Sequence, residues 1–482
     1  MEENLKYYLE NTIVSKAAIE SRLTHPFTKV RYPVRTVYAL LRKYADDFLA
    51  LGSEPRCISL AGLRGTGKTT LVWQLADHIY PRRHKDIYFF NINTLKNLGI
   101  DLHTALEEFQ RRIIKKRFNE LSEPIALLFD EIHDDENWSK SLKILYDEAR
   151  TAFILCTGSS AWLLNNTADL ARRMRIEKIY PYAFAEFIAA KTYSDNKEKF
   201  YPEKGLSDGL KEGLFYSQTA PEAFRKIKTF EAEVVAYFDK IKAVQTLELK
   251  ALRQGYIRFQ NIPGFLFYKD KYTINDGILN LLKRVILEDI PKLKPTFADY
   301  AKIEKLVLRL AGSDEINEEK LSGIIGVRQN DISALTDILS KAEIINLLLP
   351  FGGLDTKIAK NKKAFFMSPS LRSALLSALY GQELPEHFKS KLIEDIVVMY
   401  LRRVLTDGVV SFAAGSRANP DFVIETRDKP ILLEVGTGKT SSKQIKASPI
   451  PRRYGLMASD GIRLPALTGN YIQIPFNWFL LL

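Results

Sequence analysis

The pentapeptide GTGKT occurs twice in this chain of 482 residues, at 65–69 and again at 436–440. The first copy follows a short apolar run at 58–60 and precedes LVWQLADHIY, whose apolar spacing predicts a helix. Gly62 and Gly67, with four residues between them, complete the pattern of a loop whose backbone N–H groups enclose phosphate groups. The first copy therefore predicts a phosphate-binding site between a strand and a helix.

The side chains of this loop have different expected roles. Lys68 is expected to contact the β- and γ-phosphates of ATP and to act in catalysis, and the Thr69 hydroxyl is expected to ligate Mg²⁺. The residues expected to hold the nucleotide are Gly62, Gly65, Thr66, Gly67, Lys68, Thr69, Thr70 and Ser159.

A second motif supports an ATP site. The segment IALLFDEIHD at 125–134 places Asp130 and Glu131 after an apolar run, which is typical of a buried parallel strand with acids at its carboxyl end. Asp130 is expected to hold Mg²⁺ through water, and Glu131 to orient or deprotonate the attacking water. His133 completes the letters of a helicase box, but the other helicase motifs are missing. A solvated or supporting histidine is the preferred interpretation.

A third apolar run, FILCT, ends at polar residues. Thr157, Ser159 and Ser160 fall where a sensor of the γ-phosphate would lie, although a plain strand-to-helix turn explains them equally well. Farther along, Arg172 and Arg173 can supply the positive charge that phosphoryl transfer needs. Solvated arginines are the alternative.

The segment at about 50–190 closely resembles the AAA+-type ATPases of the STAND branch from bacteria and archaea. The family pattern is a strand ending in Asp-Glu, a following Trp, Thr-Gly-Ser-Ser, an Arg and Pro-x-x-Phe-x-Glu-Phe. The matching positions are Asp130, Glu131, Trp138, Thr157 to Ser160, Arg173, Pro181, Phe184, Glu186 and Phe187. The resemblance implies an ATP-binding α/β core and marks Arg173 as the catalytic or sensor arginine, although Arg172 stands where the family usually has Gly.

The second GTGKT is predicted not to bind nucleotide. The apolar strand ILLEV runs directly into Gly436, and Leu433 occupies the position that the first glycine of a phosphate loop would take. Nearby, Asp421 begins one expected strand and Glu434 lies inside the next. On an antiparallel hairpin these carboxylates can approach each other and hold a divalent metal ion.

The motif that contains Asp421 and Glu434 resembles the PD-(D/E)xK nuclease fold, and KLIEDIVVMYLRR resembles its first helix, with Glu394 as the helical acid. The resemblance implies a lysine at 436, where this chain has Gly436. Lys439 lies beyond a glycine-rich turn and is expected to be held too loosely to replace it. We therefore expect an inactive or weak nuclease-like domain that keeps the acids as a structural or weak metal site; an active nuclease is the alternative.

Between these regions, residues 191–299 read as a helical lid and connector. From residue 300, three helical patterns, a short apolar strand and a Gly-Gly turn predict a winged helix-turn-helix. The residues that can contact DNA there are Arg328, Gln329, Asn330 and Ser333 in the third helix and Lys357, Lys360, Lys362 and Lys363 in the wing. A protein-contact module with a merely solvated lysine-rich hairpin is the alternative.

Composition fits a globular protein of several domains. Hydrophobic residues make up 46% and charged residues 27% of the chain, and the net charge of +12 is compatible with nucleic acid, although many enzymes share it. Cys57 and Cys156 lie in apolar runs, which favours buried thiols over a disulfide. No apolar run approaches the roughly 20 residues that span a bilayer, and no secretion signal begins the sequence. We expect a cytoplasmic protein without membrane contact.

The expected fold class is α/β with several domains. Their ranges are 1–50 for a helical segment, 51–190 for the P-loop parallel-sheet ATPase core, 191–299 for the connector, 300–382 for the winged helix and 383–482 for a restriction-endonuclease-like α/β domain. With ATP and Mg²⁺ as cofactors, the preferred function is a nucleotide-dependent switch coupled to double-stranded DNA. The alternatives are an ATP-gated nuclease and an ATP-controlled scaffold, in which a homo-oligomer or a protein partner takes part.

Overall fold

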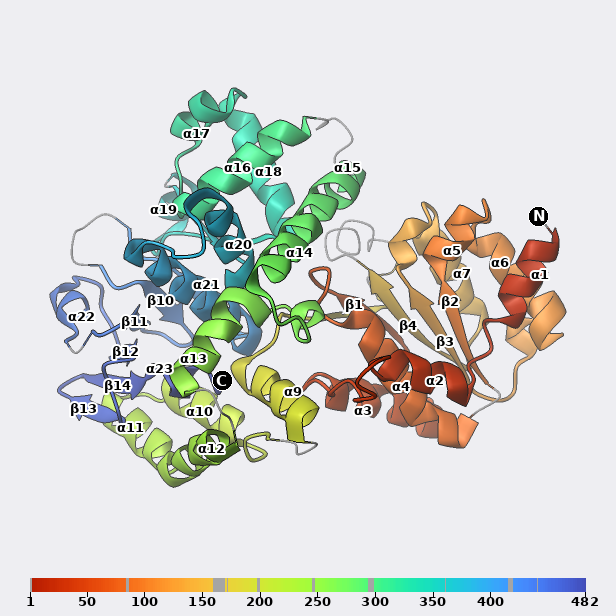
Figure 1. Ribbon diagram of the computed structural model, residues 1–482, viewed down its shortest axis with the longest axis horizontal. Helices are drawn as coiled ribbons and strands as arrows, with labels where there is room; N and C mark the ends of the chain where they lie inside the picture. The colour runs from red at the N-terminus through yellow and green to blue at the C-terminus, as the bar shows by residue number, and fades with distance from the viewer. Residues whose placement is uncertain are drawn as a thin grey trace. The chain divides into compact units, whose positions relative to one another are not determined.

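The computed structural model describes residues 2–83, 86–158, 170, 172–196, 200–244, 248–293, 299–359, 361–414, 419–439 and 441–482. The chain forms two compact units (Figure 1). The first unit comprises Met1–Ile179 and Asp289–Pro295, and the second comprises Tyr180–Glu288 and Thr296–Leu482. The chain therefore leaves the first unit at Ile179 and returns to it for a few residues before α16.

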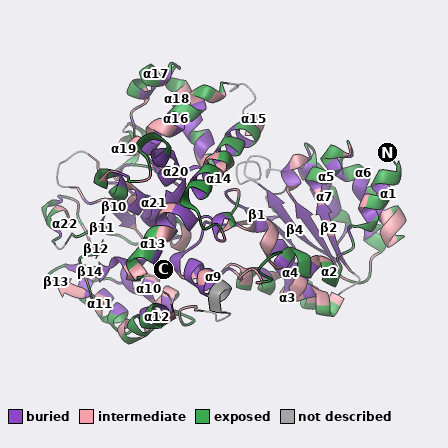
Figure 2. Cartoon of the chain, in the orientation of Figure 1, coloured by how far each residue is buried: buried purple, intermediate pink, exposed green. Residues whose placement is uncertain are grey.

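The first unit is built on a parallel sheet of five strands. The strands are β1 (Cys57–Ala61), β2 (Ile87–Asn91), β3 (Ile125–Asp130), β4 (Ala152–Gly158) and β5 (Arg175–Lys178). Their order is β2-β3-β4-β1-β5, and all neighbouring pairs are parallel. Every residue of β1, β3 and β4 is buried, as a sheet covered on both faces requires (Figure 2).

Two helical layers cover this sheet. Successive side chains of a strand point to opposite faces, so Ala126 and Leu128 of β3 join one core while Leu127 and Phe129 join the other. The first core packs against α2 (Lys16–Leu23), α3 (Tyr38–Leu51) and α4 (Lys68–Arg83). The second packs against α1 (Glu2–Glu10), α5 (Ile92–Asn97), α6 (Leu102–Phe109) and α7 (Trp138–Glu148). The segment 1–50, expected as a separate part, thus belongs to the same unit as the sheet.

The strand order determines where chemistry can occur. Because all five strands are parallel, the loop after β1 and the acids at the end of β3 lie on the same side of the sheet, at the carboxyl ends of the strands. This side is called the carboxyl edge of the sheet. Strand β4 lies between β1 and β3, so its last residues reach this edge as well. Both cysteines are free and buried, as expected from their apolar surroundings.

The second unit begins with helices and ends with a mixed sheet. Its helices are α9 (Phe184–Asn196), α10 (Leu206–Tyr216), α11 (Ala220–Lys228), α12 (Glu231–Val244), α13 (Leu249–Gly255), α14 (Lys271–Arg284), α16 (Tyr300–Gly312), α17 (Glu318–Ile325), α18 (Gln329–Lys341), α19 (Leu354–Ala359), α20 (Pro369–Tyr380), α21 (Glu386–Val404), α22 (Lys443–Ala447) and α23 (Phe476–Phe479). No helix in the described ranges is both long and apolar enough to cross a membrane.

The helices α16, α17 and α18 occupy the three segments for which the sequence predicts helices. They accompany a small antiparallel sheet of β6 (Glu315–Ile316), β8 (Lys362–Phe366) and β7 (Ile345–Leu348), in that order. The helix α19 lies in the connection between β7 and β8, where the sequence suggests only a turn. The elements therefore follow the order expected of a winged helix, with an additional short helix in the hairpin.

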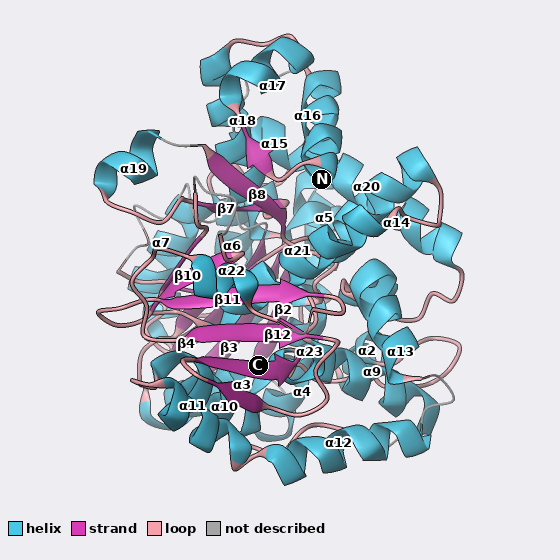
Figure 3. Cartoon of the chain, turned by 90° about the vertical axis from the view of Figure 1, so that its left-hand side faces the viewer, coloured by secondary structure: helices cyan, strands magenta, loops and turns pink. Residues whose placement is uncertain are grey.

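The mixed sheet has six strands, in the order β13-β14-β12-β11-β10-β9. Figure 3 labels β10, β11 and β12 of this sheet. The strands are β9 (Val409–Ser411), β10 (Phe422–Glu425), β11 (Ile431–Gly436), β12 (Gly455–Ser459), β13 (Ala466–Thr468) and β14 (Tyr471–Pro475). β10 and β11 are antiparallel, as the sequence predicts, and β11 pairs with β12 in parallel. The strands that carry Asp421 and Glu434 are therefore direct neighbours.

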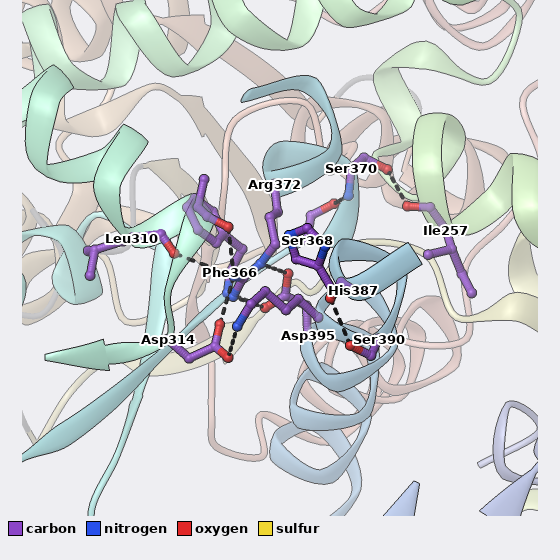
Figure 4. A network of polar contacts seen from close by, with 12 residues as sticks. Ile257, Leu310, Asp314, Phe366, Ser368, Ser370, Arg372, His387, Ser390 and Asp395 are labelled. Atoms are coloured by element: carbon purple, nitrogen blue, oxygen red, sulfur yellow. Dashed lines mark hydrogen bonds and ion pairs between the residues drawn. The ribbon is translucent and has the colours of Figure 1, made fainter. Parts of the chain in front are cut away.

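A buried ion-pair network crosses the boundary expected at 382/383 (Figure 4). The Arg372 guanidinium on α20 donates to both carboxylate oxygens of Asp395 on α21, at 2.7 and 2.9 Å, and to Asp314 Oδ1 at 2.7 Å. The Asp395 carboxylate also accepts the Phe366 N–H of β8 at 2.8 Å. These bonds join α20, α21 and β8, so 300–382 and 383–482 are parts of one compact unit.

Replacing Arg372 with Met should destabilise the second unit strongly. The change leaves the buried Asp395 carboxylate without its cation, which costs about 3–5 kcal/mol in other proteins, while Asp314 keeps the Lys391 ammonium at 2.6 Å. Urea unfolding followed by circular dichroism measures the loss. The control is Arg328→Met, which removes an arginine from an exposed ion pair with Asp331 and should change the free energy of unfolding by about 0.5 kcal/mol or less. Equal effects of the two substitutions would contradict this role.

Candidate functional site

The loop that follows β1 needs glycine for steric reasons. A Cβ atom on Gly62 would lie 2.3 Å from the Ile179 carbonyl oxygen, which is closer than real Cβ contacts. Gly67 has φ of 87°, in the left-handed region that favours glycine. The loop can therefore pass close to the chain that leaves β5 and still turn into α4.

Lys68 is buried at the first residue of α4. Its ammonium donates to the carbonyl oxygens of Gly62 at 2.8 Å and Leu63 at 3.2 Å, so it lies across the loop that precedes it. Burial lowers the pKa of Lys68, and the nearby carboxylates of Glu131 and Asp130 act in the opposite direction. The ammonium is thus held between the loop and the acids of β3.

A chain of hydrogen bonds joins the start of α4 to the ends of β3 and β4. The hydroxyls of Thr69 and Thr157 both donate to Asp130 Oδ1, at 2.8 and 2.6 Å, and Thr157 Oγ1 accepts the Glu131 N–H at 3.0 Å. Burial raises the pKa of Asp130, while the bond from Thr157 lowers it. Hydroxyl and carboxylate oxygens are the ligands that Mg²⁺ prefers, so Thr69 and Asp130 fit the metal of a bound nucleotide.

Glu131 and His133 lie together after β3. The Glu131 backbone is in the left-handed region, with φ of 54°, and its carboxylate is partly exposed at the edge of the sheet. His133 Nε2 lies 3.4 Å from Glu131 Oε2 inside the fold. Burial, aided by the Lys292 ammonium, lowers the pKa of His133 to about 4, so the ring is neutral at neutral pH. His133 is therefore a buried supporting residue, and the solvated alternative is wrong.

Arg173 lies near the amino ends of the strands, whereas the loop after β1 lies at their carboxyl ends. It precedes β5 by two residues, and its guanidinium donates to both carboxylate oxygens of Asp147 in the last turn of α7, at 2.9 and 3.2 Å. The strands run about 3.3 Å per residue, so the amino ends are roughly 15–20 Å from the loop after β1. Arg172 is exposed at the same ends. Neither arginine therefore lies near the Lys68 of the same chain.

Thr70 lies in the first turn of α4, whereas the expected sensor residues Ser159 and Ser160 fall outside the described residues. Gly65, with φ of 78°, and Thr66 complete the loop. Thr66 is buried, and its hydroxyl donates to the Leu63 carbonyl oxygen at 2.8 Å.

Four charged residues near this site have no signal in the sequence. The Arg35 guanidinium donates to the Thr66 carbonyl oxygen at 2.8 Å, and Arg64 and Asp289 form a bidentate ion pair. Lys292 contacts Asp134 at 3.0 Å. Residues 64 and 289 are 225 positions apart, so neither spacing nor a local motif can pair them.

The segment that resembles Pro-x-x-Phe-x-Glu-Phe lies in the second unit, since the compact units divide at Ile179. Glu186 is buried and accepts the Ala183 N–H at 3.0 Å and a bond from Arg403 of α21 at 3.1 Å. The Phe184 N–H donates to the Tyr400 hydroxyl, also on α21, at 2.6 Å. These residues anchor α9 to α21, and their role here is structural.

The second GTGKT folds its lysine back over its first glycine. A Cβ atom on Gly436 would lie only 2.7 Å from Cδ of Lys439, and Gly438 adopts a φ of 73° that turns the chain. The Lys439 ammonium then lies 3.2 Å from Glu434 Oε1 and 3.8 Å from Asp421 Oδ2. The expectation that Lys439 is too loosely held is wrong, because glycine at 436 leaves room for its side chain.

The surroundings hold this lysine and its acids in place. Ser459 donates to the Lys439 carbonyl oxygen at 2.6 Å, and Asp421 accepts the Val435 N–H at 2.7 Å. Burial raises the pKa of both Asp421 and Glu434, and Lys439 opposes the rise in each. The acids thus depend on Lys439 for neutralising charge.

Glu394 of α21 is the third acid that the nuclease-like pattern predicts. Burial, with the nearby Asp314 and Asp421 carboxylates, raises the pKa of Glu394 to about 7. Within the described parts of the chain, no three His, Cys, Asp or Glu side chains form a group that could hold a metal ion. Asp421 and Glu434 alone supply too few ligands for a closed metal site, and Lys439 already provides a cation between them.

The lysines of the predicted wing have partners inside the second unit. Lys357 lies 3.9 Å from Glu425, Lys362 lies 3.6 Å from Asp337, and the Lys363 ammonium lies 5.0 Å from the centre of the Phe412 ring. Lys360 falls outside the described residues. By contrast, Arg328, Gln329 and Asn330 at the start of α18 are exposed. The start of α18 is therefore a more open surface than the wing.

Two regions match known protein families. Residues 54–188 match the family described as AAA domain, and residues 265–380 match a domain of unknown function, DUF8612. The first match covers β1 to β5 with the loop, the acids and Thr157. The loop, Lys68, the two acids and Thr157 therefore all lie within the stretch that is similar to the AAA domain family.

Two curated proteins are similar to this chain. An uncharacterized protein of Methanocaldococcus jannaschii is 29% identical over 489 residues, which cover 99% of this chain and 94% of that protein. An uncharacterized protein of Haemophilus influenzae is 29% identical over 151 residues, 30% of this chain and 36% of that protein. The first similarity extends through both units.

Solved structures with a related arrangement are distant. The Aeropyrum pernix ORC1 protein in complex with DNA aligns over 77% of this chain and 98% of its own, with 13% identity and a TM-score of 0.32. The Thermotoga maritima RuvB Holliday junction branch migration motor aligns over 72% and 89%, with 15% identity and a TM-score of 0.25. Scores this low carry no argument about function.

Proposed function

We propose that this protein binds and hydrolyses ATP at the edge of the first unit's sheet and uses its nucleotide state as a switch. The observation that carries the proposal is the hydrogen-bonded chain of Thr69, Asp130, Thr157 and Glu131 beside the buried Lys68. A phosphate-binding loop alone would support only nucleotide binding. The acids at the end of β3, which β4 separates from β1, supply what hydrolysis needs in addition.

Each of these side chains has a role in the proposed reaction. Lys68 contacts the β- and γ-phosphates, and Thr69 and Asp130 hold the Mg²⁺ that neutralises phosphate charge when the nucleotide is bound. Glu131 orients the attacking water and accepts its proton. Thr157 fixes the backbone and side chain of the acidic pair, so that Glu131 stays beside the loop while Asp130 faces Thr69.

We assign Arg173 to the active site of a neighbouring copy. Its position at the edge where the strands begin keeps it from the phosphates of its own chain. An arginine supplied by another subunit can stabilise the charge that develops on the transferred phosphoryl group. This assignment implies a homo-oligomer and leaves Arg172, exposed on the same edge, as the adjacent alternative.

DNA is the partner that we propose for the switch. The exposed Arg328, Gln329 and Asn330 at the start of α18 are residue types that contact phosphates and base edges. The wing lysines support this partner less, because the Lys357 and Lys362 side chains are only 28% and 29% exposed, whereas Arg328 is 89% exposed beside Asp331. A scaffold controlled by ATP remains the alternative if no DNA binds.

Replacing Glu131 with Gln should leave ATP binding intact and lower turnover by about 100-fold, since the amide cannot accept a proton from water. Replacing Lys68 with Ala should abolish binding. Phosphate release and the fluorescence of a labelled ATP measure turnover and affinity. The exposed Glu136 provides the control, because Glu136→Gln removes a nearby acid outside the site. Normal turnover in Glu131→Gln would contradict the role of this residue.

The second candidate function is metal-dependent phosphodiester cleavage at Asp421, Glu434 and Lys439. The observation that favours it is the position of the Lys439 ammonium, 3.2 Å from Glu434 Oε1. A lysine placed there can orient water or stabilise the charge that develops during cleavage. The case is weaker than for ATP hydrolysis, because the acids offer few metal ligands.

The second candidate predicts that the protein nicks supercoiled DNA in Mg²⁺ or Mn²⁺ with ATP. Lys439→Ala should lower the rate by about 100-fold or more, and Gly436→Ala should do the same by displacing the Lys439 side chain. The exposed Lys443 of α22 offers a matched control, and Lys443→Ala should cut normally. If the unaltered protein leaves DNA intact, the inactive domain expected from the sequence is the correct interpretation.

A further inference from the structure

One helical turn of the first unit contacts both loops of the ATP site. It comprises the last residue of the helical segment Val285–Asp289 and the short helix α15 (Ile290–Leu293). Asp289 binds Arg64, which lies inside the loop between Gly62 and Gly65. Lys292, one turn later, binds Asp134, which follows the catalytic acids. We call residues 289–293 the strap.

The bond between the strap and the loop is well formed. Arg64 Nε donates to Asp289 Oδ2 at 3.1 Å, and Arg64 Nη2 donates to Asp289 Oδ1 at 2.8 Å. The Asp289 side chain is almost fully buried, whereas Arg64 retains about a fifth of its exposure. A planar guanidinium binds a carboxylate and a phosphate with the same pair of donors. Arg64 can therefore exchange one anion for another.

Asp289 is attached to the phosphate-binding loop through Arg64, which lies between Gly62 and Gly65. Its carboxylate and the Arg64 guanidinium are among the charges that act on the Lys68 ammonium, along with Glu131 and Asp130. They also act on buried His133. A triphosphate held by Lys68 would bring negative charge towards Asp289 and offer acceptors to Arg64. Like charges repel and the guanidinium can pair with either anion, so ATP weakens the hold of Asp289 on Arg64.

The strap is continuous with the second unit through the chain. Asp289 is the last residue of a helical segment that follows α14 (Lys271–Arg284) directly. After the strap, α16 begins at Tyr300, the first helix of the region whose third helix is α18. The strap therefore lies along the chain between two helices of the second unit, α14 and α16.

We propose that ATP and Asp289 compete for Arg64, so that ATP binding releases the strap from the loop and nucleotide loss restores it. This proposal rests on the proposed function, because it names the regulation of the same site. Arg64 acts as the positioning residue that detects phosphate. Lys292 keeps its bond to Asp134, which leaves the strap attached at its far end while its near end moves.

The competition has a measurable consequence for affinity. A site whose competent state is only partly populated binds with an affinity reduced by that fraction. Asp289→Asn removes the competing charge and should therefore bind ATP with Mg²⁺ about tenfold more tightly than the unaltered protein. Glu288→Gln removes the adjacent acid, which lies in an exposed pair with Arg284, and should leave the affinity unchanged.

Hydrogen–deuterium exchange of residues 285–293 provides the direct readout. In the unaltered protein, the non-hydrolysable analogue AMP-PNP should speed exchange there severalfold. In Asp289→Asn, exchange should already be fast without nucleotide and should change little on its addition. The charge-swapped double variant, Arg64→Asp with Asp289→Arg, restores the ion pair but removes the phosphate contact. It should exchange slowly with and without AMP-PNP.

The outcomes separate this proposal from the function on which it rests. If the unaltered protein binds no ATP, both fail. If it binds ATP but exchange at 285–293 is unchanged, and Asp289→Asn binds with the original affinity, the strap is a static support and only this proposal is overturned. The measurement on the unaltered protein decides the matter even if a variant fails to fold.

Discussion

The hydrogen bonds of Thr157 define the candidate active site more than any other contact. Its hydroxyl donates to Asp130 and accepts the Glu131 N–H, so one side chain at the end of β4 holds both acids of β3. This is feasible only because β4 lies between β1 and β3 in a parallel sheet. The parallel order also brings the glycine-rich loop and Lys68 to the carboxyl ends of the strands. Arg173 lies near the amino ends.

A second constraint runs through both units: buried charge requires a partner. Arg372 is buried among Asp395, Asp314 and the carbonyl oxygens of α16, and it connects helices on either side of an expected domain boundary. Lys439 neutralises Asp421 and Glu434 in the same way. The repeated GTGKT thus serves two purposes. In the first copy its glycines let the loop turn into α4, and in the second its first glycine makes room for the lysine of the same motif.

The sequence predicted the parts of the site that are local. The spacing of Gly62, Gly67 and Lys68 and the acids after an apolar run identified the loop and the strand end, because backbone geometry and charge are encoded within a few residues. The helices from α16 to α18 were predictable for the same reason. Arg64 and Asp289 could not be paired, since no pattern of period or spacing connects positions so far apart. The position of Lys439 depends on the space beside Gly436, and the sequence does not show that a glycine leaves room there for a side chain three residues later.

The division into parts was also difficult to predict. The chain enters the second unit at Tyr180, before the segment that resembles the end of the family pattern, and returns to the first unit at Asp289. Where the chain passes from one unit to the other depends on tertiary contacts, such as the bond between Glu186 and Arg403. The composition of the sequence does not reveal these contacts.

We expect the chain to have one nucleotide site, made by the first GTGKT alone. Calorimetric titration with ATP in Mg²⁺ measures the number of nucleotides that each chain binds. The expected result is one ATP per chain, with unchanged stoichiometry in Lys439→Ala. Two nucleotides per chain, with one lost in Lys439→Ala, would contradict it.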